Sequence, residues 1–469
     1  MDYLPIEKIS DHVGKEVLLR GWIYRTRSSK KVAFIVLRDV SGIVQCIVRE
    51  DNPNFSEAEK ALIESSVRLS GTVREDKRAP GGFEIDVKEF ELVGAAETFP
   101  ITQDQSTELL MDVRHLWIRS RKLTNVFKVR STVFGAIHEY FRGIKCFEIQ
   151  SPSFTPAACE GKLSQFEVEY FGSKAYLTQS WQLYAEAMIS SLERIYTIAP
   201  SFRSEKSRTT KHLTEFWHAE AELAWTDLDG IIRVAEGLIS HLAQVLAKES
   251  KKELEFLGRD VTALENIKPP FPRMTYTEAL EKLKRQGMEV EWGKDIRTLE
   301  ERELAKNFDR PIIVTHYPKE AMAFYKPADP KDPKLALCFD ILAPGEGFEL
   351  VGGSERSLDI EGMRKNLVEQ GEDPAKYEWY FDTRRFGAVP HSGFGFGVDR
   401  FIQWACGLDH IRDSIPFPRF IGIWVKQTVI FSSTRLMSCG ILVPITGCQK
   451  MITIMDWCLK LEVGTRLTN

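Results

Sequence analysis

Residues 200–222 have the residue types and spacing of a phosphate-binding hairpin, because a basic, polar loop separates two strand-like runs. Arg203 and Glu205 stand two residues apart, so on a strand they share one face. The arginine could hold a phosphate, while the carboxylate accepts from an amino-bearing heterocycle and Phe216 stacks on that heterocycle. A solvated salt-bridge ladder on a surface hairpin explains the same residues equally well. This segment alone therefore leaves both interpretations open.

Two further segments carry related chemistry. Residues 392–401 read SGFGFGVDRF, in which alternating glycines let a backbone approach a ligand and Arg400, in a helix's first turn, points at a phosphate. Residues 348–356 read FELVGGSER. There Glu349 could hold Mg²⁺ beside phosphates, and Arg356 could take a small carboxylate or an amide oxygen. Packing glycines and an ordinary Gly-Gly hairpin turn remain the alternatives for these two segments.

Alternating apolar and polar residues predict short strands throughout the N-terminal part of the chain. The opening strand includes residues 17–23, residues 33–49 form a hairpin, and residues 65–76 and 83–94 add two more strands. Five short strands predict a small barrel of the OB type. Pro100 and the polar run behind it then indicate a linker.

The pattern changes after the linker. Residues 124–142 and 230–248 have helical spacing, and a strand through Phe147–Ile149 is stopped by Pro152. Helices mixed with antiparallel-looking strands predict an α+β fold. The expected parts are an OB-fold barrel, a linker, an α+β domain that carries the three segments above and an atypical tail, over residues 1–98, 99–123, 124–419 and 420–469 respectively.

The composition narrows the class of protein. A formal net charge of -4 gives no global positive field, so any nucleic-acid contact must rest on local basic patches. The eight cysteines show no CxxC pair, which favours reduced thiols and a cytoplasmic location. The N-terminus has no apolar stretch typical of a signal peptide, and no apolar run of membrane-spanning length is visible.

Together, the order and content of these segments resemble the motifs of class II aminoacyl-tRNA synthetases. Residues 147–152 (FEIQSP) resemble motif 1, FRSE with its loop and strand resembles motif 2, and GFGFGVDR resembles motif 3. The barrel before the catalytic core resembles the aspartyl, asparaginyl and lysyl subgroup. Within it, HLTEFWHAEAE and ELVGGSER are most similar to archaeal-type asparaginyl enzymes. The resemblance covers roughly residues 15–419 and implies a homodimer with Pro152 at its interface.

This resemblance implies that the chain activates L-asparagine with ATP and Mg²⁺ and transfers it to tRNA(Asn). It also implies an ATP site made of Arg203, Glu205, His212, Phe216, Glu349, Gly397 and Arg400. Arg203 would hold the α-phosphate, and His212 and Arg400 the γ-phosphate. Glu349 would be the Mg²⁺ ligand, with Arg203, Arg400 and Glu349 the catalytic set.

Asparagine and aspartate are nearly isosteric, so charge and hydrogen-bond polarity must separate them. Aspartyl enzymes carry a lysine in a motif resembling QLYK, where this chain reads QLYA with Ala185 last. Arg356 would then donate to the side-chain oxygen, while Glu220 accepts from the amide and repels a carboxylate. The implied amino-acid site consists of Glu160, Gln182, Glu220 and Arg356. Glu160 stands in a loop that reads EGKLSQF, a departure from the usual family pattern that resembles EGGATLF.

The barrel has the residues of a single-strand RNA site, with cations for the backbone and aromatics for stacking. By resemblance, Phe34 stacks on the central anticodon base, Gln45 reads its edge and Glu84 reads a neighbouring base. Arg27 belongs to the basic cluster beside them. A solvated basic face, with Phe34 in the barrel core, is the alternative.

Three rivals remain from the sequence. A non-discriminating aspartyl enzyme is disfavoured by Ala185, and an asparagine synthetase paralogue by the barrel. A catalytically impaired tRNA-binding paralogue is disfavoured by the retained Arg203, Glu349 and Arg400.

The tail, residues 420–469, generates the first prediction. Proteins of this type typically end shortly after a segment like Ile415–Arg419, whereas here the chain continues with little charge and no sustained period, as a translated frameshift or read-through would. Truncation after Arg419 should leave adenylate formation and the melting temperature essentially unchanged. Pyrophosphate exchange and thermal melting of both forms test this. Unfolding or loss of activity on truncation would make the tail an integral part of the catalytic domain.

Overall fold

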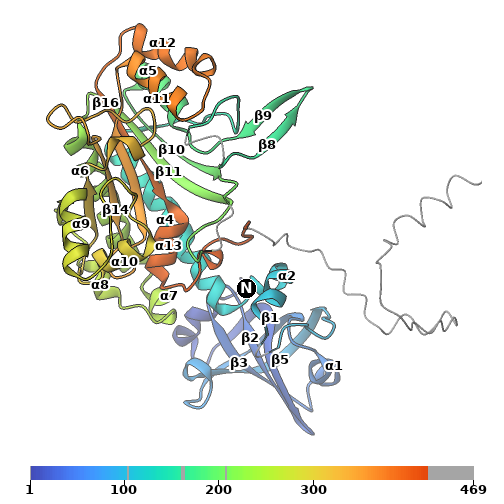
Figure 1. The fold of residues 1–469 in the computed structure, drawn as a ribbon. Helices are drawn as coiled ribbons and strands as arrows, with labels where there is room; N and C mark the ends of the chain where they lie inside the picture. The colour runs from blue at the N-terminus through green and yellow to red at the C-terminus, as the bar shows by residue number, and fades with distance from the viewer. Residues whose placement is uncertain (1, 103–104, 160–163, 206–208, 421–469) are drawn as a thin grey trace, which may run out of the picture. The chain divides into compact units, whose positions relative to one another are not determined.

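The computed structural model describes residues 2–102, 105–159, 164–205 and 209–420, and Figure 1 shows their fold. The N-terminal strands close into a barrel in the order β1-β2-β3-β5-β4, as the sequence predicts. Their bounds are β1 Glu16–Ser29, β2 Val32–Arg38, β3 Ile43–Arg49, β4 Ser66–Glu75 and β5 Phe83–Gly94. All pairs are antiparallel except β3 with β5. The predicted OB-type barrel is therefore confirmed.

An eight-stranded sheet forms the second part of the fold, in the order β12-β13-β14-β15-β16-β11-β10-β6. Its strands are β6 Phe147–Glu148, β10 Arg194–Phe202, β11 Glu215–Ala224, β12 Arg273–Thr275, β13 Ile312–Thr315, β14 Cys338–Leu342, β15 Glu349–Glu355 and β16 His391–Gly397. The pairs from β13 through to β10 are all antiparallel. A smaller sheet contains β7 Phe154–Thr155, β8 Glu167–Tyr170 and β9 Ser173–Leu177, and in Figure 1 the β8–β9 hairpin projects from the body.

Helices cover this sheet. The apolar faces of α4 (Arg121–Gly143), α6 (Leu228–Glu249) and α13 (Val398–Cys406) share one core with β11, β15 and β16. The remaining α-helices are α1 Phe55–Lys60, α2 Thr107–Asp112, α3 Arg114–Trp117, α5 Gln182–Leu192, α7 Lys251–Phe256, α8 Val261–Glu265, α9 Tyr276–Arg285, α10 Thr298–Ala305, α11 Ile360–Glu369 and α12 Glu378–Arg385. The predicted α+β class is confirmed, and α2 and α3 lie within the stretch expected to be a linker.

Among the described residues, one helix is long and apolar enough to cross a membrane by length and composition alone, although the sequence analysis found no apolar run of that length. This is α6, and 56% of its most apolar window is buried inside the protein. Ile231, Leu238 and Leu246 of α6 lie fully buried in the core that the helix shares with α4 and the sheet. We therefore interpret α6 as a core helix.

Two local expectations are corrected by the strand bounds. Arg203 and Glu205 do not share a strand face, because β10 ends at Phe202 and both residues lie in the following loop. Gly352 and Gly353 do not form a turn, because both lie inside β15. A Cβ on Gly353 would lie 2.5 Å from the Phe339 ring, so glycine is needed there for close strand packing.

The described chain ends in a segment that is tied to the catalytic domain. The buried guanidinium of Arg114 donates to the carbonyl oxygens of Arg412, Ile415 and Pro416 at 2.8–3.1 Å. Thr214 N donates to the carbonyl oxygen of Arg419 at 2.8 Å, and Phe420 packs beside this segment. A truncation that retains Phe420 therefore preserves these contacts. The rest of the tail lies outside the described residues.

Candidate active site

One cavity brings together every residue that the sequence predicts for an ATP site, and we call it cavity A. It is lined among others by Arg203, Glu205, His212, Phe216, Glu349, Gly397 and Arg400. These side chains come from the β10–β11 hairpin, the start of β15 and the junction of β16 with α13. Because β15, β16 and β11 are neighbours in the sheet, segments far apart in sequence meet at one place.

Cations dominate the electrostatics of cavity A. Arg400 Nη1 lies 3.0 Å from Glu349 Oε2, and the Arg203 guanidinium lies over the Phe216 ring at 5.4 Å. Burial, with Arg400, Lys211 and Arg203 nearby, lowers the pKa of His212 to about 4. His212 is therefore neutral at pH 7 and can donate or accept a hydrogen bond. The arrangement suits an anion with several oxygens.

Two neighbouring carboxylates, of which Glu349 lines cavity A, could hold a divalent cation. Asp340 of β14 and Glu349 of β15 both point at Gly352, whose Cβ position lies 3.4 Å from Asp340 Oδ1 and 2.9 Å from Glu349 Oε1. Burial and the neighbouring Glu349 raise the pKa of Asp340 to about 8. Burial acts to raise the pKa of Glu349, but Arg400 and Arg203 hold it below its usual value. Paired carboxylate oxygens of this kind are ligands that Mg²⁺ prefers, and a cation would displace the Asp340 proton.

A second cavity, cavity B, adjoins cavity A. The two share Arg203, His218, Glu349 and Gly395 in their walls. Gln182, Glu220 and Arg356, predicted for amino-acid binding, also line cavity B. Glu160, the fourth predicted residue, lies outside the described residues. A small molecule in cavity B would therefore meet a nucleotide in cavity A at Arg203.

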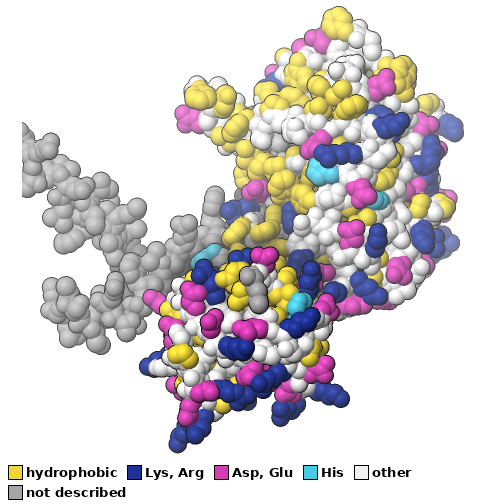
Figure 2. Space-filling model, turned by 180° about the vertical axis from the view of Figure 1, so that it is seen from behind, with side chains coloured by type: hydrophobic (Ala, Val, Ile, Leu, Met, Phe, Trp, Pro, Cys, Tyr) yellow, Lys and Arg dark blue, Asp and Glu magenta, His cyan; other side chains and the backbone are white. Residues whose placement is uncertain are grey.

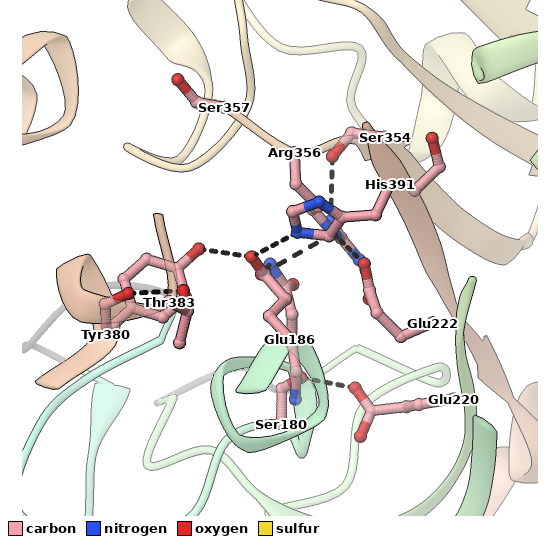
Figure 3. Close-up of polar contacts among 12 residues, drawn as sticks. Ser180, Glu186, Glu220, Glu222, Ser354, Arg356, Ser357, Tyr380, Thr383 and His391 are labelled. Carbon is pink, nitrogen blue, oxygen red and sulfur yellow. Dashed lines mark hydrogen bonds and ion pairs between the residues drawn. The ribbon is translucent and has the colours of Figure 1, made fainter. Parts of the chain in front are cut away.

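Arg356 is buried in the wall of cavity B and forms a bidentate ion pair with Glu222 (Figure 3). Its Nε and Nη2 donate to the two carboxylate oxygens of Glu222, both at 2.9 Å, and its Nη1 donates to Ser354 Oγ at 2.9 Å. A Cβ on Gly393 would lie 1.9 Å from Glu222 Oε2, so the glycine in β16 makes room for this carboxylate. Burial alone would lower the pKa of Arg356, but Glu222 and Glu186 raise it. The cation is thus matched by a carboxylate before any ligand enters.

Sequence reasoning named Glu220 as the acceptor near Arg356 and missed Glu222. Glu220 also lines cavity B, but its carboxylate accepts from Ser180 Oγ and from Trp181 N at 2.8 Å, at the start of α5. The EAE pattern of β11 could have revealed Glu222, since residues two apart on a strand share a face. Asp340 was missed because nothing in its own strand distinguishes it from a core-strand aspartate.

Glu186 of α5 is the hub of a buried polar network behind Arg356 (Figure 3). It accepts from Tyr380 Oη at 2.7 Å, contacts His391 Nε2 at 3.0 Å and pairs with Arg384. Burial acts to raise the pKa of Glu186, but Arg384, His391 and Arg356 hold it well below its usual range. Glu186, Glu222 and His391 lie close enough to hold a metal ion, yet the arginines already occupy their carboxylates. We therefore interpret the group as an ion-pair network.

Ala185 does not face cavity B. Its side chain is fully buried in a small core with Trp181, Ile189, Ile195 and Ala224. The sequence argument against aspartate used Ala185 as the site of a missing cation. The charged residue of this helix turn is the next one, Glu186, which is buried and paired with Arg384 and His391.

On the barrel, the residues predicted for RNA binding lie on adjacent strands of one surface. The Arg27 guanidinium lies over the Phe34 ring at 5.1 Å, and Gln45 Nε2 donates to Glu84 Oε2 at 3.2 Å. Ala33 and Ile35 on either side of Phe34 are buried, so Phe34 faces outward and not into the core. Figure 2 shows Lys and Arg side chains over the barrel, interspersed with Asp and Glu.

Pro152, predicted for a dimer interface, is exposed. Phe147 and Phe154, which flank it in sequence, are large apolar side chains with 57% and 47% of their surface exposed.

Comparison with known proteins agrees with this geometry. Residues 106–421 match the family described as tRNA synthetases class II (D, K and N), and residues 17–93 match the OB-fold nucleic acid binding domain. The asparagine–tRNA ligase of Thermoplasma acidophilum is 45% identical over 424 residues, which cover 89% of this chain and 99% of that protein. The corresponding ligase of Thermococcus gammatolerans is 46% identical over 409 residues, covering 87% of this chain and 95% of that protein.

A solved structure is similar over the same length. The crystal structure of asparaginyl-tRNA synthetase from Pyrococcus horikoshii complexed with asparaginyl-adenylate superposes with a TM-score of 0.87 at 44% identity. The match covers 90% of this chain and 99% of that one.

The cationic wall of cavity A generates the second prediction. Arg203→Ala and Arg400→Ala should each lower the rate of ATP–pyrophosphate exchange by about 100-fold or more, because each removes a preorganised charge from a water-excluded site. Arg285→Ala, at the exposed end of α9, is the matched control and should exchange at the normal rate. Undiminished exchange by Arg203→Ala, in a protein with an unchanged melting temperature, would contradict the assigned role.

Proposed function

The chain belongs to the class II tRNA synthetases of the D, K and N group, and on this premise we propose that it is an asparagine–tRNA ligase. It activates L-asparagine with ATP to the adenylate and transfers it to tRNA(Asn). The observation that carries the choice of amino acid is the pairing of Arg356 with Glu222 in the wall of cavity B.

That pairing suits a primary amide and opposes a carboxylate. An amide offers one acceptor and one donor, so its oxygen can take a hydrogen bond from Arg356 while its nitrogen donates to Glu222. An aspartate carboxylate would meet Glu222 and Glu220, both buried and both acidic, beside an Arg356 that is already paired with Glu222. Charge repulsion therefore adds to the loss of a hydrogen bond.

Activation needs positioning and electrostatics and no protein nucleophile. Asparagine in cavity B presents its α-carboxylate toward Arg203, where the two cavities meet, for attack on the α-phosphorus of ATP. Arg203 and Arg400 stabilise the charge that develops as pyrophosphate leaves. Phe216 and Glu205 hold the adenine ring and its amino group. The terminal 3′-hydroxyl of the tRNA then attacks the adenylate carbonyl.

Mg²⁺ would be held by Glu349 together with Asp340. The closeness of both carboxylates to the Cβ position of Gly352 and the raised pKa of Asp340 support this assignment. When bound, the ion would neutralise phosphate charge. Arg400, paired with Glu349 in this structure, stays within reach of the same phosphates.

The barrel would recognise the anticodon of tRNA(Asn). We assign stacking on a base to Phe34, base-edge contacts to Gln45 and Glu84, and backbone charge to Arg27. The outward-facing Phe34 ring with Arg27 above it supports this surface. We propose residues 1–98 as this domain, residues 99–123 as the hinge, residues 124–419 as the catalytic domain and residues 420–469 as an appended tail.

A homodimer and a cytoplasmic location complete the proposal. The exposed Phe147, Pro152 and Phe154 support an interface between two copies of the chain. Of the rival functions, a catalytically impaired paralogue is disfavoured by the complete set of predicted residues around cavity A. A non-discriminating aspartyl enzyme is disfavoured by the carboxylates around Arg356.

Substrate choice gives the third prediction. ATP–pyrophosphate exchange should depend on asparagine and barely on aspartate. Glu222→Gln should reduce the preference for asparagine more than Glu220→Gln does, because Glu222 pairs with Arg356 and Glu220 does not. Equal exchange rates of the wild-type protein with the two amino acids would sink the asparaginyl assignment. If a folded Glu222→Gln protein keeps the full preference for asparagine over aspartate, the Arg356–Glu222 pair does not select the substrate.

A further inference from the structure

Lys211 is a buried cation in the wall of cavity A that the mechanism above does not use. It lies in the loop between β10 and β11, one residue before His212, and its side chain is 6% exposed. It lines the cavity together with Arg203, Arg400 and Glu349.

The partner of Lys211 comes from a distant helix. Its ammonium is paired with the carboxylate of Glu301, which lies near the start of α10, 90 residues further along the chain. The Glu301 side chain is only 12% exposed. A buried ion pair is a weak source of stability, because both charges lose their hydration. A purely structural role therefore explains the pair poorly.

Glu301 is held in a fixed place by the loop that leads into β15. Gly347 has a φ of +67°, and a Cβ there would lie 2.4 Å from the backbone of Glu301 and Arg302. Gly345 N donates to the carbonyl oxygen of Ala305 at 3.2 Å. Two residues after Gly347 stands Glu349, so Glu301 is anchored beside the wall that carries this carboxylate.

The backbone beside Lys211 is also fixed, because the carbonyl oxygen of Thr210 accepts from Ile411 N at 2.8 Å. The lysine stem, in contrast, has several rotatable bonds and ends in a compact point charge. The ammonium can therefore turn from Glu301 toward the interior of cavity A without a change in the backbone.

We propose that Lys211 is a phosphate-binding residue, which Glu301 holds in place in the nucleotide-free cavity and releases to the polyphosphate when ATP enters. The inference rests on the function proposed above and adds a third cation to Arg203 and Arg400. A polyphosphate offers several charged oxygens to the wall that Lys211 lines. Glu301 then remains buried without its cation, and a buried carboxylate in that condition takes up a proton.

The groups that face Glu301 set the pH at which this proton uptake is seen. They are Lys211 from the hairpin loop, Glu349 from β15 and Arg400 from α13. Burial raises the pKa of Glu301 to about 7, although Lys211 opposes the rise. When the Lys211 ammonium turns away, it no longer lowers the pKa of Glu301, so that pKa rises further. At pH 8 the free protein carries mostly ionised Glu301, so proton uptake on ATP binding is expected there.

Calorimetry of ATP binding to the full chain at pH 8, in two buffers of different ionisation enthalpy, counts the protons exchanged. Glu301→Gln should take up fewer protons than the wild-type protein, because its amide cannot titrate. Glu303→Gln is the matched control, since Glu303 lies on the same helix and pairs with Lys306 at 3.5 Å outside the cavity. It should behave as wild type. Equal proton uptake by Glu301→Gln and the wild-type protein overturns the release of Lys211.

Exchange kinetics test the phosphate contact separately. Lys211→Met should raise the KM for ATP about 10- to 100-fold, the worth of one charge-assisted hydrogen bond, with the KM for asparagine unchanged. Lys211→Arg keeps the charge and should retain most of the ATP affinity, which also guards against a folding defect in Lys211→Met. An unchanged KM for ATP in Lys211→Met overturns the inference. Absence of asparagine-dependent exchange in the wild-type protein would instead overturn the proposed function.

Discussion

The arrangement of the catalytic domain depends on a buried cation, Arg356, that must be satisfied by carboxylates. An isolated guanidinium in such a place would cost several kcal/mol, and removal of one partner from a buried pair is strongly destabilising. Glu222 meets it from the neighbouring part of the sheet, and Glu186 approaches it from α5 at 3.8 Å. The same satisfaction of charge determines what cavity B accepts. Because Arg356 is already paired with Glu222, this part of cavity B favours a neutral ligand with a hydrogen-bond donor and an acceptor over an anion.

The strands of the sheet place cavity B next to cavity A. Arg203, Arg400 and Lys211 line cavity A, where the polyphosphate would bind. Cavity B shares Arg203 and also contains Lys326, but its carboxylates Glu220 and Glu222 lie beside Arg356. Glycines allow the two cavities to lie so close together. Gly352 leaves space for Asp340 and Glu349, and Gly393 leaves space for Glu222. The glycines in these segments therefore make room for charged side chains to lie close together, which matters more here than loop flexibility.

Much of this could be predicted from the sequence, and the reason for the rest is physical. The barrel, the long helices and the residues around cavity A follow from local periodicity and from motifs that keep their chemistry within a few residues. Glu222, Asp340 and Glu301 were not found, because each takes its meaning from a partner on another strand or helix. The sequence argument took Ala185 as the position of an absent charge, but the orientation of Ala185 into a core depends on how α5 packs, which periodicity does not reveal.

The most direct test of the matched cation compares the binding of two non-hydrolysable adenylate analogues, one with the asparagine side chain and one with the aspartate side chain. Calorimetry at neutral pH on the wild-type protein and on Glu222→Gln measures the difference at equilibrium, without catalysis. The wild-type protein should bind the amide analogue at least about 100-fold more tightly than the carboxylate analogue. Glu222→Gln should lose most of this preference. Equal affinity of the wild-type protein for the two analogues would contradict the role of Arg356 and Glu222 in substrate choice.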